Sequence, residues 1–178
     1  MELKMATFEG AVTFQGNPVT LEGNLVEPNN KAPNFRVKRN VQDTVEFDEN
    51  KGNKVFLLTS ALSVDTDVCA HQLEKFNEMA DNIDGNVEIW YITRDLPFAL
   101  ERFAKEKGID KVNFMSDYQF REFGDSFGLT IRDFDLLARS AIVVDKDGNV
   151  VYKEVVSEAT NEPDYNAAVN AAKSAAMN

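Results

Sequence analysis

The sequence predicts an α/β fold in which a central mixed sheet is flanked by helices and preceded by an N-terminal β-hairpin. The main observation is an alternation that begins at Lys54, where strand patterns and helix patterns follow one another to the end of the chain. The apolar runs KVFLLTS (residues 54–60) and NVEIWYIT (residues 86–93) have the length of buried strands, and each precedes a helical stretch. Strands and helices that alternate in this way form a sheet covered by helices on both faces.

The first third of the chain has strand and loop patterns. Apolar and polar residues alternate in ATFEGAVTFQGNPVTLEG, which predicts a hairpin over about residues 6–22 with its turn at the Gly-Asn-Pro sequence of residues 16–18. The segment 27–34 is rich in Pro and Asn and is expected to be a loop. The stretches 35–39 and 44–49 are predicted as short, half-exposed strands.

The helices of the second part have recognisable start and stop signals. Asp65 or Thr66 is the expected N-cap of the first helix, and Pro97 and Gly108 mark the two ends of the second. One face of the first helix is formed by Cys69, Leu73, Phe76, Ala80 and Ile83. The remaining elements are predicted as a strand at 112–116, a shorter helix at 118–128, a hairpin at 140–156 that turns at Asp147-Gly148, and an alanine-rich helix at 162–177.

Composition limits the classes of function. The 178 residues, 43% of them hydrophobic, suit a single domain over 1–178. The formal net charge of −11 argues against nucleic acid or an anionic membrane as a partner, because both require clustered Lys or Arg. The start of the chain lacks the pattern of a signal peptide, and no apolar run approaches the ~20 residues of a membrane helix. A single cysteine fits the reducing cytoplasm, so a cytoplasmic location is expected.

Several kinds of chemistry find no support in the sequence. The phosphate-loop patterns GxGxxG and GxxxxGK are missing. DKDGN at residues 145–149 resembles the start of a calcium loop, but Val150 and Val156 stand where that loop needs Gly and Glu, so a hairpin turn is the better interpretation. One Cys and one His are too few for a soft metal site, and His71 is expected to be an exposed helix residue. We therefore expect neither a metal nor a cofactor.

The single cysteine, Cys69, has two interpretations. A free cysteine is usually a small buried apolar residue. Cys69, however, lies in the predicted first turn of a helix directly after a buried strand, where backbone N–H groups and the helix dipole favour the thiolate. Asp65 and Asp67 oppose this effect, so a cation from elsewhere in the fold is needed. A dithiol oxidoreductase would carry its second cysteine where Thr66 stands, which makes that alternative weak.

Five stretches give the chain a specific resemblance. It resembles the thiol peroxidase subgroup of the peroxiredoxins from about Thr7 to Lys173, in FQGNPVTLEG, VDTDVCAHQLEKFN, DLPFALERF, LLARSAIVVDKDGNV and TNEPDYNAAVNAAK. The resemblance implies a thioredoxin-like, three-layer fold and an antioxidant enzyme that reduces hydrogen peroxide and small organic hydroperoxides. It also implies a homodimer that is reduced by thioredoxin or another thiol.

The resemblance assigns roles to individual residues. Cys69 falls on the peroxidatic cysteine, which peroxide converts to a sulfenic acid. Thr66 falls on the hydroxyl that hydrogen-bonds thiolate and peroxide, and Arg139 on the guanidinium that completes the site. We therefore expect Arg139 within hydrogen-bonding reach of the Cys69 sulfur or its loop. Leu62 and Val68 are expected to line the substrate pocket.

Two positions depart from the family pattern. Leu62 stands where the active-site loop of the family has a proline, and leucine does not fix φ as proline does. Ala104 occupies the position of the resolving cysteine, so no internal disulfide can form. These departures keep an alternative open, namely a degenerate member that senses oxidation or binds a partner without efficient turnover. Fast, saturating peroxide turnover separates the enzyme from this alternative.

Overall fold

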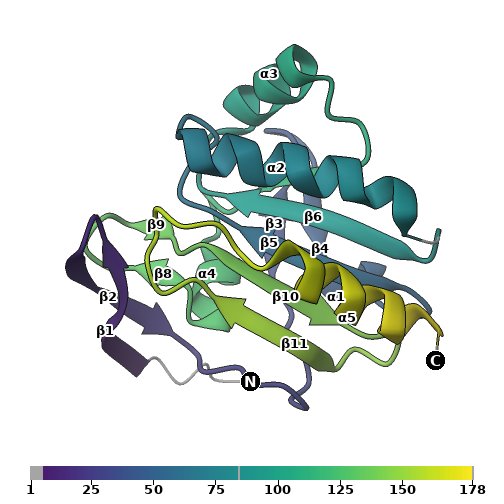
Figure 1. Cartoon of the computed structure of the whole chain (residues 1–178), viewed down its shortest axis with the longest axis horizontal. Helices are drawn as coiled ribbons and strands as arrows, with labels where there is room; N and C mark the ends of the chain where they lie inside the picture. Colours follow the sequence, from purple (N-terminus) through teal and green to yellow (C-terminus); the bar gives the residue numbers. More distant parts are fainter. Residues whose placement is uncertain (1–5, 84, 178) are drawn as a thin grey trace.

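The protein, described here by a computed structural model for residues 6–83 and 85–177, contains a large mixed sheet and a smaller antiparallel one (Figure 1). The strands are β1 (Ala6–Phe14), β2 (Asn17–Gly23), β3 (Arg36–Lys38), β4 (Thr44–Glu46), β5 (Val55–Ser60), β6 (Val87–Thr93), β7 (Asn113–Ser116), β8 (Thr130–Ile131), β9 (Leu136–Leu137), β10 (Ser140–Val144) and β11 (Val150–Val155). The helices are α1 (Phe47–Asn50), α2 (Asp67–Met79), the 3-10 turn η1 (Ala80–Asn82), α3 (Pro97–Lys107), α4 (Glu122–Phe127) and α5 (Tyr165–Met177).

The large sheet has the strand order β11-β10-β5-β6-β7-β3-β4. β5, β6 and β7 are parallel, and β10 pairs with β5 in the antiparallel direction. Because crossovers between parallel strands are right-handed, α2 and α3 lie on the same face of the sheet. Figure 1 shows α5 beside α2 on that face, with α1 and α4 behind the sheet. The predicted mixed sheet between two helical layers is confirmed.

Most predicted elements are present with small shifts in their ends. The hairpin is confirmed as β1 and β2, but its turn lies at Gln15 and Gly16, which have φ angles of 51° and 81°. The predicted Gly-Asn-Pro turn is wrong, because such a turn needs two residues with positive φ and the ring of Pro18 holds φ near −65°. Pro18 instead pairs with Thr13 in the ladder.

Two other predicted boundaries also differ. The strand expected at 44–49 ends at Glu46, after which the chain forms α1. The helix expected at 118–128 begins only at Glu122, because Arg121 has a left-handed backbone with φ of 61°. The side chain of Asp117 accepts the free amides of Phe123 and Gly124 in the first turn of this helix. The two-residue strands β8 and β9 had no recognisable sequence pattern.

The helix that follows β5 begins where the sequence indicated. Thr66 is its N-cap and accepts the amide of Cys69, which decides between the two predicted caps. Cys69, Leu73 and Phe76 are fully buried, as the predicted helix face requires. The helix is shorter than predicted, since α2 ends at Met79. In the part of the chain that the structure describes, no helix has the length and apolar character needed to cross a bilayer.

We expect the free energy of unfolding to decrease as the pH rises from about 4 to about 6, because of Asp117. Burial raises the pKa of the Asp117 carboxyl from 3.8 to about 6, although Arg94 and two backbone amides act in the opposite direction. The folded state then binds this proton more tightly than the unfolded state. The stabilisation is complete below the unfolded pKa and is lost as the pH rises through the folded pKa. One pKa unit is worth about 1.4 kcal/mol, so the whole effect is about 3 kcal/mol.

Urea unfolding of the protein and of Asp117→Asn at about pH 5 and about pH 7.5 measures this effect. The variant should be less stable at both pH values, since asparagine offers one acceptor oxygen to Arg94 and the two amides. Its deficit should be about 1 kcal/mol smaller at the higher pH, where the native carboxyl has lost its proton. A deficit that grows with pH would show that Arg94 outweighs burial.

Candidate active site

The candidate site is a cavity of about 310 Å³ where the carboxyl end of β5 meets the first turn of α2. Four separate segments build it: the tip of the N-terminal hairpin, the loop before α2, the chain before β10, and the loop after β11. The lining residues are Phe14, Gln15, Leu62, Thr66, Asp67, Val68, Arg139, Ala159 and Thr160. The structure therefore brings Leu62, Thr66, Val68 and Arg139 together. Cys69, the residue after Val68, is fully buried and is not among the lining residues.

Thr66 and the start of α2 supply hydrogen-bonding groups to this cavity. The Thr66 hydroxyl accepts the Cys69 amide at 3.4 Å and donates to the Ser63 carbonyl at 3.1 Å. Among the described residues, the amides of Asp67 and Val68 have no acceptor, as is usual in the first turn of a helix. Both residues line the cavity, so the first turn of α2, where the positive end of the helix dipole lies, forms part of its wall.

Arg139 places a buried guanidinium at the wall of this cavity. Its side chain is only 2% exposed, so it is not a surface arginine. Nε and Nη2 donate to the Ala159 carbonyl at 3.0 and 2.8 Å, and Nη1 donates to Gln72 Oε1 at 2.6 Å. A guanidinium has five N–H groups, so these three bonds fix its orientation and leave two donors for a ligand in the cavity.

Neither Thr66 nor Arg139 hydrogen-bonds to the Cys69 sulfur, so their roles toward the sulfur stay predictions. A buried tyrosine is the other polar neighbour of Cys69: the Tyr91 hydroxyl donates to the Cys69 carbonyl at 3.1 Å. Burial raises the pKa of Tyr91 well above its ordinary value, and the neighbouring Cys69 adds to this effect while Arg139 opposes it. Tyr91 is therefore a permanent hydrogen-bond donor beneath the site.

Comparisons with known proteins identify relatives of this chain. The family model described as Redoxin matches residues 27–169. A thiol peroxidase of Halalkalibacterium halodurans is 46% identical over 165 residues, which are 93% of this chain and 98% of the relative. The thiol peroxidase of Bacillus subtilis is 44% identical over 162 residues, 91% of this chain and 96% of the relative.

The chain belongs to the thiol peroxidase group of the peroxiredoxin family. The peroxiredoxin-like protein of Aquifex aeolicus has the same fold, with a TM-score of 0.85 and 32% identity over 96% of this chain and 98% of its own. The thiol peroxidase of Chromobacterium violaceum gives a TM-score of 0.79 at 20% identity, covering 90% and 92% of the two chains, and supports the fold alone. The predicted thioredoxin-like peroxiredoxin fold and peroxidase activity are confirmed.

The sequence analysis missed three polar groups beside the candidate site, namely Gln72, Tyr91 and the carbonyl of Ala159. Gln72 had a detectable signal, because it lies three residues after Cys69 on a helix face that is otherwise apolar and is fully buried. Its Nε2 donates to Thr59 Oγ1 at 2.6 Å, so the amide that orients Arg139 is itself held by β5. In the sequence, Tyr91 cannot be distinguished from the other residues of a buried core strand.

The tip of the N-terminal hairpin is fixed over the cavity by Glu158. The Glu158 carboxylate accepts Thr13 Oγ1 at 2.9 Å and the Gly16 amide at 2.8 Å from the hairpin. It also accepts the hydroxyl and amide of Thr160 at 2.7 and 2.8 Å. These bonds, with Thr160 the largest contributor, lower the pKa of Glu158 to about 2. The carboxylate therefore holds this wall of the cavity at any pH near neutrality.

Ala104 is the one predicted site position that lies elsewhere. It is half-buried on α3 and lines a different cavity together with Arg39, Asn40, Leu100, Glu101, Val112, Asn113 and Phe114. Its carbonyl accepts the Gly108 and Ile109 amides that close the helix, so this part of α3 is regular. A cysteine at this position would reach Cys69 only after local unwinding of α3.

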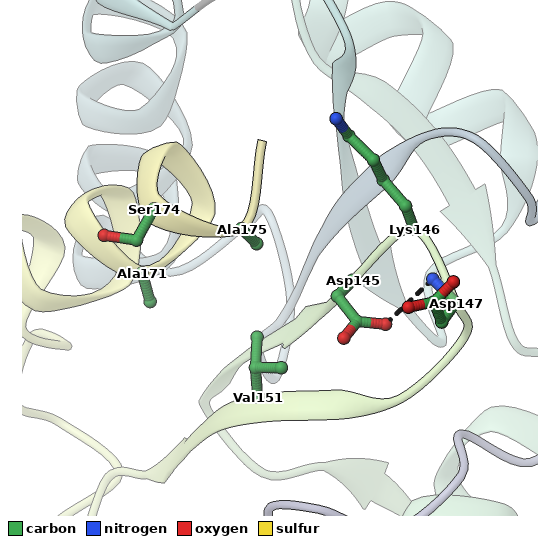
Figure 2. Close-up of a pocket in the computed structure, with 7 residues that line it drawn as sticks. All are labelled: Asp145, Lys146, Asp147, Val151, Ala171, Ser174 and Ala175. Atoms are coloured by element: carbon green, nitrogen blue, oxygen red, sulfur yellow. Dashed lines mark hydrogen bonds between the residues drawn. The ribbon is translucent and has the colours of Figure 1, made fainter. Parts of the chain in front are cut away.

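Two other polar clusters lie outside the candidate cavity, and one of them, formed by His71 and Glu162, borders it through Asp67, Val68 and Thr160. A cavity of about 240 Å³ lies between the β10–β11 turn and α5, and Figure 2 shows the residues that line it. This cavity lies near Val144, at the end of β10 that pairs with the start of β5. Arg139 precedes the opposite end of β10, so this cavity and the candidate site lie at different ends of the strand. His71 is exposed, as predicted, and pairs with Glu162. No group of three or more potential metal ligands occurs within residues 6–83 and 85–177.

Proposed function

We propose that this chain reduces hydrogen peroxide and small organic hydroperoxides through the Cys69 thiolate. The observation that carries the proposal is a buried cysteine in the first turn of α2, next to a cavity that also holds the buried guanidinium of Arg139. The helix end and the guanidinium both favour the thiolate, which is the nucleophilic form of cysteine.

In the proposed reaction the Cys69 sulfur attacks one peroxide oxygen and the O–O bond breaks. The departing oxygen takes both electrons of that bond and then a proton, leaving as water or an alcohol, while Cys69 becomes a sulfenic acid. The free amides of Asp67 and Val68 and the two remaining donors of Arg139 stabilise the charge that develops on the departing oxygen. Two external thiols then restore Cys69, forming a disulfide between them and releasing water.

We further propose thioredoxin or another thiol as the reductant, a cytoplasmic location, and one peroxidase domain over 1–178 that forms a homodimer. Exposed Leu96 and Phe98 at the start of α3 are suited to a subunit contact, because large apolar side chains are normally covered. Sedimentation that gives a monomer at micromolar concentration would contradict the dimer.

The test of the proposed function is the rate at which peroxide consumes the Cys69 thiol, with Cys69→Ser as the blank. Fast consumption and saturating turnover with a thiol reductant are expected. A reaction at the rate of an ordinary free thiol would favour the alternative, a degenerate member that senses oxidation or binds a partner. Leu62 in the loop and Ala104 in place of a resolving cysteine are the features that favour this alternative.

We expect Thr66→Val to slow peroxide consumption about 10-fold, because the variant loses the hydroxyl that lines the cavity. It also loses the N-cap of α2, which costs about 1 kcal/mol of stability. Thr66→Asn separates the two effects, since its side chain caps the helix but has no hydroxyl, and Thr66→Ser should retain most of the rate. If Thr66→Val reacts as fast as the native protein, Thr66 is only a helix cap.

A further inference from the structure

The loop that leads into the peroxidatic helix, residues 61–66, is held only weakly by its own backbone. It has Leu62 where the family has proline, so no ring restricts φ at this point. The two amides of this loop that donate to backbone carbonyls form long bonds: the Ala61 amide donates to Ile92 at 3.4 Å, and the Thr66 amide donates to Ser63 at 3.3 Å. Another group must therefore fix the loop if Thr66 and Cys69 are to keep their positions.

The carboxylate of Asp95 makes shorter contacts with this loop. Asp95 follows the carboxyl end of β6, next to the loop. Its Oδ1 accepts the Ser63 hydroxyl at 2.7 Å, and its Oδ2 accepts the Val64 amide at 2.9 Å. Oδ2 also accepts the Thr93 hydroxyl at 2.8 Å, which fixes the carboxylate itself to β6.

The directions of these bonds require a carboxylate. The Ser63 hydroxyl accepts the Asp65 amide at 3.1 Å, so its own proton is free to go to Asp95. The Thr93 hydroxyl accepts the Asp95 amide at 3.1 Å and likewise donates its proton to the carboxylate. Three donors thus converge on two oxygens that only accept. An asparagine has a single acceptor oxygen and would leave at least one of these donors without a partner.

A continuous series of hydrogen bonds leads from Asp95 to the cysteine. Ser63, held by Asp95 through its hydroxyl, accepts the Thr66 hydroxyl on its carbonyl at 3.1 Å. Thr66 in turn accepts the amide of Cys69 at 3.4 Å. The position of the Asp95 carboxylate is thereby transmitted to the first turn of α2.

We propose that Asp95 is a positioning residue for the peroxidase reaction. Its carboxylate fixes the loop 61–66 and the first turn of α2. The inference rests on the proposed role of Cys69. The charge of Asp95 cannot help directly, because a nearby negative charge raises the pKa of a thiol and disfavours the thiolate. Its contribution is geometric. If geometry dominates, removing the carboxylate slows peroxide consumption; if charge dominates, removing it makes peroxide consumption faster.

The test is Asp95→Asn, with the rate of peroxide consumption, the pKa of the Cys69 thiol and amide hydrogen exchange over residues 61–66 as readouts. Loss of the charge should lower the thiol pKa and so increase the thiolate fraction near neutral pH. The rate constant with hydrogen peroxide should nevertheless fall about 10-fold, because a displaced thiol loses its alignment with the donors. Exchange at the Val64 amide should become faster. A rate that rises with the thiolate fraction, with unchanged exchange, would overturn the proposal.

Asp65→Asn is the matched control, since it removes a carboxylate from the same loop. Asp65 is exposed and, within residues 6–83 and 85–177, its side chain makes only a long contact, 3.4 Å, with exposed Arg102. This variant should also lower the thiol pKa, but it should leave exchange at Val64 unchanged and alter the rate less than about twofold.

Ser63→Ala is the second variant and decides the question if Asp95→Asn does not fold. It removes one of the three bonds to Asp95 and keeps the charge, so a rate about 3-fold lower and faster exchange are expected. Ser63→Thr restores the hydroxyl and should restore both. Unchanged exchange in Ser63→Ala would overturn the proposal. If native Cys69 reacts only as an ordinary thiol, the proposed function fails, whereas the exchange result still decides whether Asp95 fixes the loop.

Discussion

Replacing Arg139 by methionine is expected to slow peroxide consumption at neutral pH by about 100- to 1,000-fold. The variant removes the only cation that lines the cavity within the described residues, as well as two N–H groups available to the departing oxygen. The thiol pKa should rise, because Asp65 and Asp67 remain near Cys69 without a compensating charge. The rate loss at neutral pH then has two parts, a smaller thiolate fraction and a slower reaction of each thiolate. Rates measured above the new thiol pKa isolate the second part.

Stability requires a separate control in this experiment. Methionine leaves Gln72 Oε1 and the Ala159 carbonyl without the donors that they now have, so the variant should also unfold more easily. Arg139→Lys keeps the charge but cannot form the forked contact with Ala159, and an intermediate rate is expected. Arg132→Met is the matched control, since Arg132 is an exposed arginine paired with Glu22. If neither the pKa nor the rate changes in Arg139→Met, Arg139 has been misassigned.

The second large effect concerns the product of oxidation. Because Cys69 is the only cysteine in the sequence, a sulfenic acid formed on it would have no partner thiol in its own chain. Full burial of Cys69 also disfavours a disulfide between two subunits, because the two sulfurs must approach to about 2 Å. Excess peroxide without a reductant should therefore convert the protein to the sulfenic and then to the sulfinic form. Intact-mass analysis and a non-reducing gel should show no linked dimer.

Ala104→Cys should divert this product to an internal disulfide, provided that α3 unwinds locally. The cavity around Ala104 is distinct from the Cys69 cavity, so disulfide formation depends on this movement. Ala99→Cys, at another half-buried alanine of α3, is the control and should over-oxidise like the native protein. If Ala104→Cys over-oxidises without forming any internal disulfide, position 104 is not a resolving site.

The elements of the fold were predictable where the signal is local. The cap at Thr66, the helix start at Pro97 and the left-handed Gly108 at the end of α3 each depend on a few neighbouring residues. The hairpin turn was misplaced by about one residue, because Gly-Asn-Pro resembles a turn while the ladder requires positive φ at Gln15. The strands β8 and β9 have only two residues each and form through pairing with β2 and each other, which no local pattern indicates.

The candidate site was predictable only in part. Cys69 and Thr66 are neighbours in sequence, and helix geometry is sufficient to bring them together. Arg139 lies 70 positions after Cys69. The chemistry of the thiolate predicts a nearby cation but does not say which one, and Arg139 was identified only from the family resemblance. Asp95 and the Ala159 carbonyl could not be predicted, because their contacts join loops that only the folded sheet brings together.

Because Cys69 is fully buried, the size of a molecule determines whether it can reach the sulfur. A small peroxide can reach a buried sulfur after a slight movement of the surrounding side chains, whereas the cysteine of a protein reductant is attached to a surface too broad to follow it. If the reductant is a protein, we therefore expect reduction to require local opening of the first turn of α2, and the frequency of that opening to limit the turnover number at high reductant concentration. For the same reason, bulky thiol-labelling reagents used to survey reactive cysteines in cell extracts would register this nucleophile as inert.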